Sequence, residues 1–206
     1  MNNLQGTVCV VDDDPSMRRA VARLCRSAGL EVRPFANANE LLNAGAPPSP
    51  ACLVLDVSMP GLSGLDLQTE LAHRGIQTPV VFITGHGDIP MSVRALKAGA
   101  VDFLTKPFHH RDLLKVVQTA LSRDVRLATV HKEREEVAQR LNSLTPRERE
   151  VFGLVIKGLL NKQIGGELGA SEQTIKVHRR RIMDKMGVKS VAELVQAAVK
   201  VGVVEG

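Results

Sequence analysis

The sequence predicts an α/β module, a doubly wound five-stranded parallel sheet, followed by an all-α four-helix module that contains a helix-turn-helix. Three observations support this prediction. Five short β-branched runs alternate with helical patterns in residues 1–122, and four further helical patterns occupy residues 143–206. Charge divides the chain at the same place. Residues 1–122 hold 11 Lys+Arg and 11 Asp+Glu, whereas residues 123–206 hold 16 and 11, so the whole net charge of +5 lies in the last part.

In the first module, β-branched apolar runs predict buried strands, and apolar residues spaced by three and four predict helices. The first strand is Thr7–Val11. The first helix is expected to run from Pro15 to Ala28, with Asp14 as its N-cap and Gly29 as its stop signal. The remaining strands are expected at 31–35, which has the weakest pattern, 51–55, 79–84 and 101–105, and the remaining helices at 37–43, 64–74, 89–98 and 109–122.

The segment 123–142 is highly charged and contains no Gly or Pro. Its apolar residues keep helical spacing, and pairs such as Glu136–Arg140 favour a helix, so we expect the last helix of the first module to continue as a linker helix. A flexible polar linker is the alternative. The expected domains are therefore 1–122, the linker 123–142, and 143–206.

The second module begins with Thr145 as N-cap, Pro146 at the first helical position and Glu148 at the capping-box position. Its helices are expected from 146 to a stop at Gly158, at 161–168, from a cap at Ser171 to 186, and at 190–201. The short turn at 169–170 joins the second and third helices into a helix-turn-helix. Apolar residues Ile175, Val177, Ile182 and Met186 are expected to mark the packed side of the third helix, with its basic residues turned outward.

Composition excludes several classes of protein. A chain of 206 residues allows one or two domains. No apolar run approaches the ~18–20 residues of a membrane span, and acids at 12–14 do not suit a signal peptide, so no membrane association is expected and the location is expected to be cytoplasmic. Three scattered cysteines exclude a disulfide scaffold and suit a reducing compartment. The absence of Trp and Tyr argues against single-strand binding by stacking.

Polar side chains follow four strands of the predicted sheet. Asp12, Asp13 and Asp14 follow the first strand, Asp56 the third, Thr84 the fourth and Lys106 the fifth. The carboxyl ends of parallel strands meet at one edge, so these groups are expected to share a pocket. Crowded carboxylates repel one another, and a divalent cation such as Mg²⁺ (or Mn²⁺) relieves the repulsion. A carboxylate beside such a cation can accept a phosphoryl group, whose oxygens Lys106 and Thr84 can bind.

Each of these residues also has an ordinary structural interpretation. A single aspartate after a strand is more often a cap or a turn residue, and Asp14 is expected to be a cap. Thr84 alone is more often an ordinary strand residue. The complete set at successive strand ends favours a functional pocket.

Four motifs closely resemble the receiver domain of two-component response regulators: VVDDD (10–14), LDVSMPGLSG (55–64), VFITGHGD (81–88) and AVDFLTKPF (100–108). The resemblance covers about residues 5–122, points to the FixJ-like branch and implies the CheY/flavodoxin-like sheet. It implies that Asp56 is the phosphoacceptor and that Thr84 and Phe103 are switch residues, although Phe103 is equally expected as core packing. It implies a catalytic set of Asp56, Thr84 and Lys106, metal ligands Asp12 (mainly through water), Asp13, Asp56 and the Ser58 backbone carbonyl, a cis Lys106–Pro107 bond, and variable tuning positions at Ser58 and His86.

Two further stretches resemble the LuxR/NarL-type DNA-binding domain, LTPREREV (144–151) and GLLNKQIGGELGASEQTIKVHRRRIMDKMGVKS (158–190). A basic run such as HRRR is by itself more often a solvated face. The resemblance makes that interpretation less favoured than DNA binding. It implies DNA contacts from Lys162, Thr174, Lys176, Val177, His178, Arg180, Arg181 and Lys185, and dimerisation through 191–201. The sequence departs from the family at Leu160, at Arg181, and at Gly165 and Gly166, each expected to weaken its helix by about 1 kcal/mol relative to Ala.

Together the resemblances imply a response regulator that a sensor histidine kinase phosphorylates on Asp56 and that then dimerises, binds double-stranded promoter DNA and works with RNA polymerase, most simply as an activator. The chain is then no conventional enzyme. It would catalyse only its own Mg²⁺-dependent phosphorylation from phosphohistidine and slow dephosphorylation. The alternative is a phosphorylation-independent regulator whose receiver serves only for dimerisation. A phosphotransferase or hydrolase is a further alternative, but the sequence contains no Walker loop, no Gly-rich dinucleotide turn and no Ser or Cys nucleophile motif. The four-helix pattern argues against another alternative, an RNA-binding antiterminator.

Overall fold

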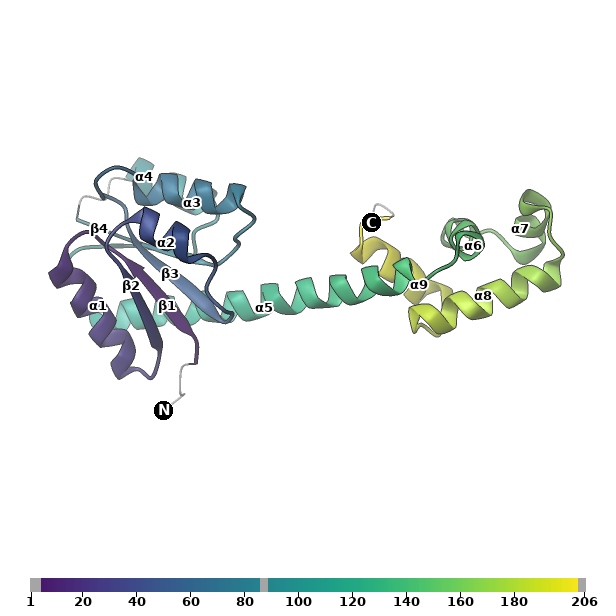
Figure 1. Cartoon of the computed structure of the whole chain (residues 1–206), viewed down its shortest axis with the longest axis horizontal. Coiled ribbons are helices and arrows are strands. Elements are labelled where there is room, and N and C mark those ends of the chain that lie inside the picture. Colours follow the sequence, from purple (N-terminus) through teal and green to yellow (C-terminus); the bar gives the residue numbers. More distant parts are fainter. Residues whose placement is uncertain (1–4, 86–88, 204–206) are drawn as a thin grey trace. The chain divides into compact units, whose positions relative to one another are not determined.

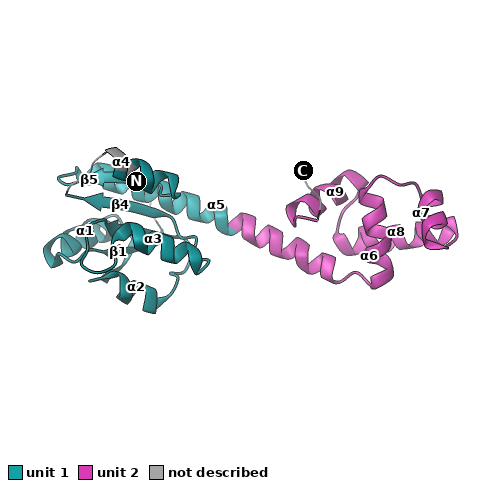
Figure 2. Cartoon of the chain, turned by 90° about the horizontal axis from the view of Figure 1, so that it is seen from above, with its two compact units in different colours: residues 1–128 teal, residues 129–206 magenta. Residues whose placement is uncertain are grey.

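The computed structural model describes residues 5–85 and 89–203, and His86 lies outside the described residues. The chain forms two compact units, residues 1–128 and 129–206 (Figure 2). Among the described residues, no helix is both long and apolar enough to cross a membrane.

The first unit contains a five-stranded parallel sheet, which confirms the predicted fold class. Its strands are β1 (Thr7–Val11), β2 (Glu31–Phe35), β3 (Ala51–Asp56), β4 (Val80–Thr84) and β5 (Asp102–Thr105), in the order β2-β1-β3-β4-β5. Helices α1 (Pro15–Ser27) and α5 (His110–Asn142) cover one face, and α2 (Ala38–Ala44), α3 (Gly64–His73) and α4 (Ile89–Lys97) cover the other (Figure 1). The reversal of strand order between β1 and β3 leaves a crevice at their carboxyl ends.

The side-chain alternation of the central strands builds a core on each face of the sheet. Val8 and Val10 of β1 pack toward α1 and α5, whereas Cys9 and Val11 pack toward α2 and α3. Asp14 caps α1 as predicted, because its carboxylate accepts a hydrogen bond from the Ser16 amide. The three cysteines are free thiols, and burial raises the pKa of Cys9 and Cys25 to about 11, so both are protonated at neutral pH.

The first unit ends beyond Ser122, because α5 continues to make contacts with the sheet. The buried carboxylate of Asp124 accepts a hydrogen bond of 2.9 Å from the Ala51 amide at the start of β3. Arg123 reaches the Gly99 carbonyl oxygen at 3.4 Å. The helix itself runs unbroken to Asn142, and its last part belongs to the second unit.

The second unit adds four helices, α6 (Pro146–Ile156), α7 (Asn161–Leu168), α8 (Glu172–Met186) and α9 (Val191–Lys200), to the end of α5. Thr145 and Glu148 form the predicted capping box of α6. Gly169 and Gly187 end α7 and α8 in the left-handed conformation, with φ of 63° and 67°. The shared core includes Val151, Phe152, Ile164, Ile175, Ile182 and Leu194, and Val137 and Leu141 of α5 pack against it.

The structure corrects the interpretation of Gly165. A Cβ atom at this buried position would lie 2.6 Å from the Ala170 carbonyl oxygen, because the turn between α7 and α8 folds back onto α7. An alanine would therefore not strengthen the helix, and glycine is required by the close approach of the backbone. Gly166, by contrast, would meet nothing within 4 Å and remains a simple weak point.

We predict opposite effects for two neighbouring substitutions in α7. Gly165→Ala should lower the free energy of unfolding by about 1–3 kcal/mol through overpacking. Gly166→Ala is the matched control and should raise it by up to about 1 kcal/mol through helix propensity. Urea unfolding followed by circular dichroism checks both. Equal stabilisation by the two alanines would contradict the close approach at Gly165.

Candidate functional site

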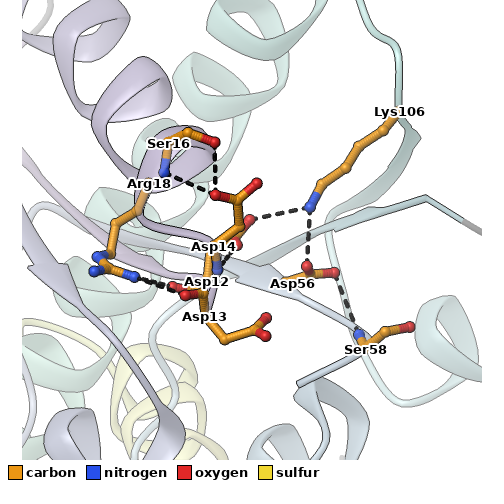
Figure 3. Close-up of polar contacts among 8 residues, drawn as sticks. All are labelled: Asp12, Asp13, Asp14, Ser16, Arg18, Asp56, Ser58 and Lys106. Carbon is orange, nitrogen blue, oxygen red and sulfur yellow. Dashed lines mark hydrogen bonds and ion pairs between the residues drawn. The ribbon is translucent and has the colours of Figure 1, made fainter. Parts of the chain in front are cut away.

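Three carboxylates meet at the carboxyl ends of β1 and β3. One oxygen from each of Asp12, Asp13 and Asp56 lies within 4.8 Å of the others, and Figure 3 shows the three side chains turned toward the same space. Asp12 and Asp56 are buried, whereas Asp13 is exposed. Because Asp13 faces solvent, a cation can reach the two buried acids from its side of the pocket.

Lys106 bridges the two buried acids from the loop after β5. Its ammonium donates hydrogen bonds of 3.0 Å to Asp12 Oδ2 and 2.9 Å to Asp56 Oδ2 (Figure 3). Burial raises the pKa of the Asp12 carboxyl, against the opposing effect of Lys106. Burial also works to lower the pKa of Lys106, but its bonds to Asp56 and Asp12 raise that pKa above its ordinary value. The ammonium therefore remains charged and partly neutralises the pocket.

The backbone around Asp56 holds its second oxygen in place. Asp56 Oδ1 accepts a hydrogen bond of 3.2 Å from the Ser58 amide. Gly64 begins α3 directly against β3, where a Cβ atom would lie 2.3 Å from the Asp56 carbonyl oxygen. Only glycine allows this approach, which places the start of α3 beside the acid.

The donor set fits a divalent cation. All three side chains offer carboxylate oxygens, the ligands that hard cations prefer. An octahedral cation with bonds near 2.0–2.1 Å separates its oxygens by about 3–4 Å, and the three acids already lie within that range or slightly beyond it. Small side-chain movements would complete such a site.

The two residues expected to act as a switch lie on β4 and β5, and the Thr84 carbonyl oxygen accepts a hydrogen bond of 2.7 Å from the Lys106 amide. Thr84 is fully buried at the end of β4. Phe103 of β5 is half-buried, with its ring tilted by 49° against that of Phe82 at a centroid distance of 6.5 Å. The Lys106–Pro107 bond is cis, as the resemblance implied.

The role of one residue near the pocket was predicted from the sequence, and the role of another was not. Asp14 is part of the acidic run but serves as the cap of α1, as expected. Arg18 was not anticipated, although its guanidinium donates to the backbone carbonyls of Asp12 and Asp13. It fixes the loop that carries both acids. An arginine in the first turn of a helix gives no local signal of that contact.

Three basic residues of α8 face solvent as expected, whereas Arg179, also expected to face outward, is half-buried and its guanidinium donates a hydrogen bond of 3.2 Å to the Leu159 carbonyl oxygen. Lys176, Arg180 and Arg181 are exposed and form no ion pair with the described carboxylates, and Lys162 of α7 is also exposed. Val177 is 43% exposed, so its assignment to the packed side was wrong, whereas its place among the outward residues agrees with the structure. The helical period explains this, because Ile175, Ile182 and Met186 already fill the buried stripe.

Three of the expected DNA contacts are less free than the sequence suggested. The Thr174 hydroxyl lies 2.8 Å from the Ser171 hydroxyl at the helix cap. His178 is half-buried, and its Nδ1 atom is buried without a hydrogen-bond partner among the described residues. Lys185 forms an ion pair with the buried Glu148 of α6. All of the expected DNA contacts, these three included, stay predictions.

Two family descriptions match the chain. The response regulator receiver domain matches residues 8–118, and the luxR family of bacterial regulatory proteins matches residues 142–198. Neither match depends on the other, and together they extend over both units.

Relatives align with the chain across both units. The chain is 49% identical to nodulation protein W of Bradyrhizobium diazoefficiens over 196 residues, which is 95% of this chain and 86% of that protein. It is 42% identical to the transcriptional regulatory protein FixJ of Azorhizobium caulinodans, covering 95% and 93%. The solved structure of response regulator StyR is similar with a TM-score of 0.82 and 47% identity, covering 96% of this chain and 100% of that one.

The bridge made by Lys106 generates a prediction for metal binding. Lys106→Met should tighten Mg²⁺ binding roughly tenfold, because the ammonium that competes for Asp12 and Asp56 is lost. Calorimetric titration measures the affinity. Asp13→Asn is the control of opposite sign and should weaken it. Unchanged or weaker Mg²⁺ binding by the Lys106→Met variant would argue against a shared site.

Proposed function

The chain belongs to the two-component response regulators that join a receiver domain to a LuxR-type helix-turn-helix, and from that premise we propose that phosphorylation of Asp56 controls its binding to promoter DNA. A protein of this family regulates transcription and is not a conventional enzyme. One observation supports the proposal most directly. The buried carboxylate of Asp56 lies within hydrogen-bond distance of Lys106 and within 4.8 Å of Asp12 and Asp13.

The proposed donor is the phosphohistidine of a sensor histidine kinase, and the proposed location of this chain is the cytoplasm. An Asp56 carboxylate oxygen attacks phosphorus, the phosphorus–nitrogen bond breaks, and the histidine leaves as neutral imidazole after taking up a proton. Asp12, Asp13, Asp56 and the Ser58 carbonyl would hold Mg²⁺. The cation, when bound, supplies positive charge that offsets the repulsion between the acids and the phosphoryl group.

The new acyl phosphate changes the balance of charge around Lys106. A phosphoryl group brings about −1.5 to −2 charge and three acceptor oxygens. Lys106, already 2.9 Å from Asp56 Oδ2, can pair with one of them, and the Thr84 hydroxyl can donate to another. Movement of Thr84 would open space for Phe103, so that the face of α4 and β5 repacks.

The proposed output is binding to promoter DNA by paired copies of α8. A helix such as α8 has a width that suits the major groove. There Lys176, Val177 and Arg181 would face base edges, and Arg180 would contact a phosphate. Dimerisation on phosphorylation would place two such helices on paired half-sites. We expect the regulator to act as an activator, with RNA polymerase as its partner.

We predict that acetyl phosphate with Mg²⁺ labels the wild-type chain and that Asp56→Asn abolishes the labelling, because an amide is a poor nucleophile. Intact-protein mass spectrometry counts the phosphoryl groups. Asp112→Asn, at an exposed position of α5, is the control and should label normally. Labelling of the Asp56→Asn variant at undiminished stoichiometry would refute the assignment. A variant that is not labelled but binds DNA as the phosphorylated wild type does would favour the phosphorylation-independent alternative.

A second prediction concerns Arg180. Arg180→Ala should weaken binding to every duplex sequence and make the plot of log K against log[salt] shallower by about 0.9, because one phosphate contact is lost. Binding measured by fluorescence anisotropy between 50 and 200 mM salt supplies the slope. Arg111→Ala, in the first unit, should leave the slope unchanged. A slope that Arg180→Ala does not alter would exclude a phosphate contact.

A further inference from the structure

A buried carboxylate of α6 holds the far end of α8. Glu148 is only 3% exposed, and its Oε2 atom accepts hydrogen bonds of 2.6 Å from Lys185 Nζ and 2.8 Å from the Thr145 amide. Lys185 lies in the last turn of α8, whereas the residues of a recognition helix that reach base edges come mainly from its first turns. The ammonium is therefore engaged inside the unit.

The same ammonium also binds the chain where α5 ends. Lys185 Nζ donates a second hydrogen bond, of 3.2 Å, to the Ser143 carbonyl oxygen. One turn earlier in α5, the Arg140 guanidinium donates to the Met186 carbonyl oxygen at 3.2 Å. Two cationic side chains, one from each helix, thus cross-link the end of α5 to the end of α8.

We propose that Lys185 is a positioning residue, which fixes α8 to the start of α6 through Glu148 and to the end of α5 through Ser143, and that it does not contact DNA phosphate. The inference rests on the proposed DNA binding by α8 and assigns one of its basic residues a different role. It also names the route by which the orientation of α5 reaches the DNA-binding helix.

The charges around Lys185 favour this role over a phosphate contact. Lys185 and the Thr145 amide hold the pKa of Glu148 at about 2, so the carboxylate is charged at any pH used for DNA binding. Turning Lys185 toward DNA would leave that buried charge without its cation, which is costly. Lys176, Arg180 and Arg181 have no such carboxylate partner among the described residues, so each is available to DNA.

Further contacts join the last part of α5 to the second unit. Val137 and Leu141 pack against the core of the second unit, and Lys200 of α9 forms an ion pair of 2.8 Å with Glu133. The last part of α5 is thus part of the DNA-binding unit. A rotation or shift of this part moves α8 with it, because Lys185 and Arg140 join the two ends.

The salt dependence of DNA binding separates the two roles of Lys185. The full-length chain and its Lys185→Met variant are titrated with a short duplex of mixed sequence between 50 and 200 mM salt. A positioning role predicts roughly tenfold weaker binding with an unchanged slope of log K against log[salt]. A slope shallower by about 0.9 would mean that Lys185 contacts a phosphate, and the proposal would be wrong.

Glu148→Gln gives a test with opposite signs. If Lys185 positions α8, the variant binds DNA more weakly, because the ammonium has lost the anion that anchors it. If Lys185 contacts phosphate, its release from Glu148 makes binding tighter, or leaves it unchanged, and the proposal fails. Lys185→Arg, which keeps a cation beside Glu148, should restore much of the affinity lost in Lys185→Met.

Thermal unfolding separates positioning from stability alone. All titrations are run well below the melting temperature of each variant. Lowered melting temperatures with wild-type affinity in the folded state would overturn the proposal. If either single variant does not fold, the double variant Glu148→Gln/Lys185→Met, which removes both charges, takes its place and should bind DNA weakly with the wild-type slope. A wild-type chain that binds no duplex would instead refute the proposed DNA binding itself.

Discussion

The first unit depends on the compensation of negative charge at one edge of its sheet. Parallel strands bring their carboxyl ends together, so acids that follow β1 and β3 must crowd. Asp12 and Asp56 are buried there, and buried carboxylates are costly without a cation. Lys106 supplies that cation in the structure at 3.0 and 2.9 Å. A cation or a phosphoryl group that enters the pocket therefore changes the hydrogen-bond partners of Lys106, because this one ammonium binds both buried acids.

The second unit solves the same problem for a different purpose. Its buried carboxylate, Glu148, has one lysine and one backbone amide as partners, and no second acid shares the cation among the described residues. The first arrangement leaves an exposed acid, Asp13, and is open to ligands. The second buries its one acid, pairs it with a partly exposed lysine and holds helices together. Equivalent chemistry is reactive in one unit and structural in the other because of how many like charges converge.

The elements and the acidic pocket were predictable from the sequence, because each depends on local patterns. Strand-end acids, caps such as Asp14 and Thr145, and glycine stops are read within a few residues of where they act. The pocket joins residues up to 94 positions apart, but the convergence of parallel strand ends made it predictable, whereas distant side-chain contacts that follow from no such rule were not. Glu148 and Lys185 are 37 positions apart, and Asp124 and Ala51 are 73 apart. Gly165 was misjudged for the same reason, since helix propensity says nothing about a backbone oxygen that returns from the next turn.

The bond between Asp124 and Ala51 sets a limit on the length of β3. This strand bears Asp56 at its carboxyl end, while its first amide is bound by α5, about 16 Å away for six residues in extended form. Side chains alternate between the two faces of a sheet, so inserting or deleting one residue would either turn Asp56 away from its neighbours or withdraw the amide from Asp124. The number of residues between Ala51 and Asp56 is therefore constrained from both ends of β3, by α5 at one end and by the acidic pocket at the other.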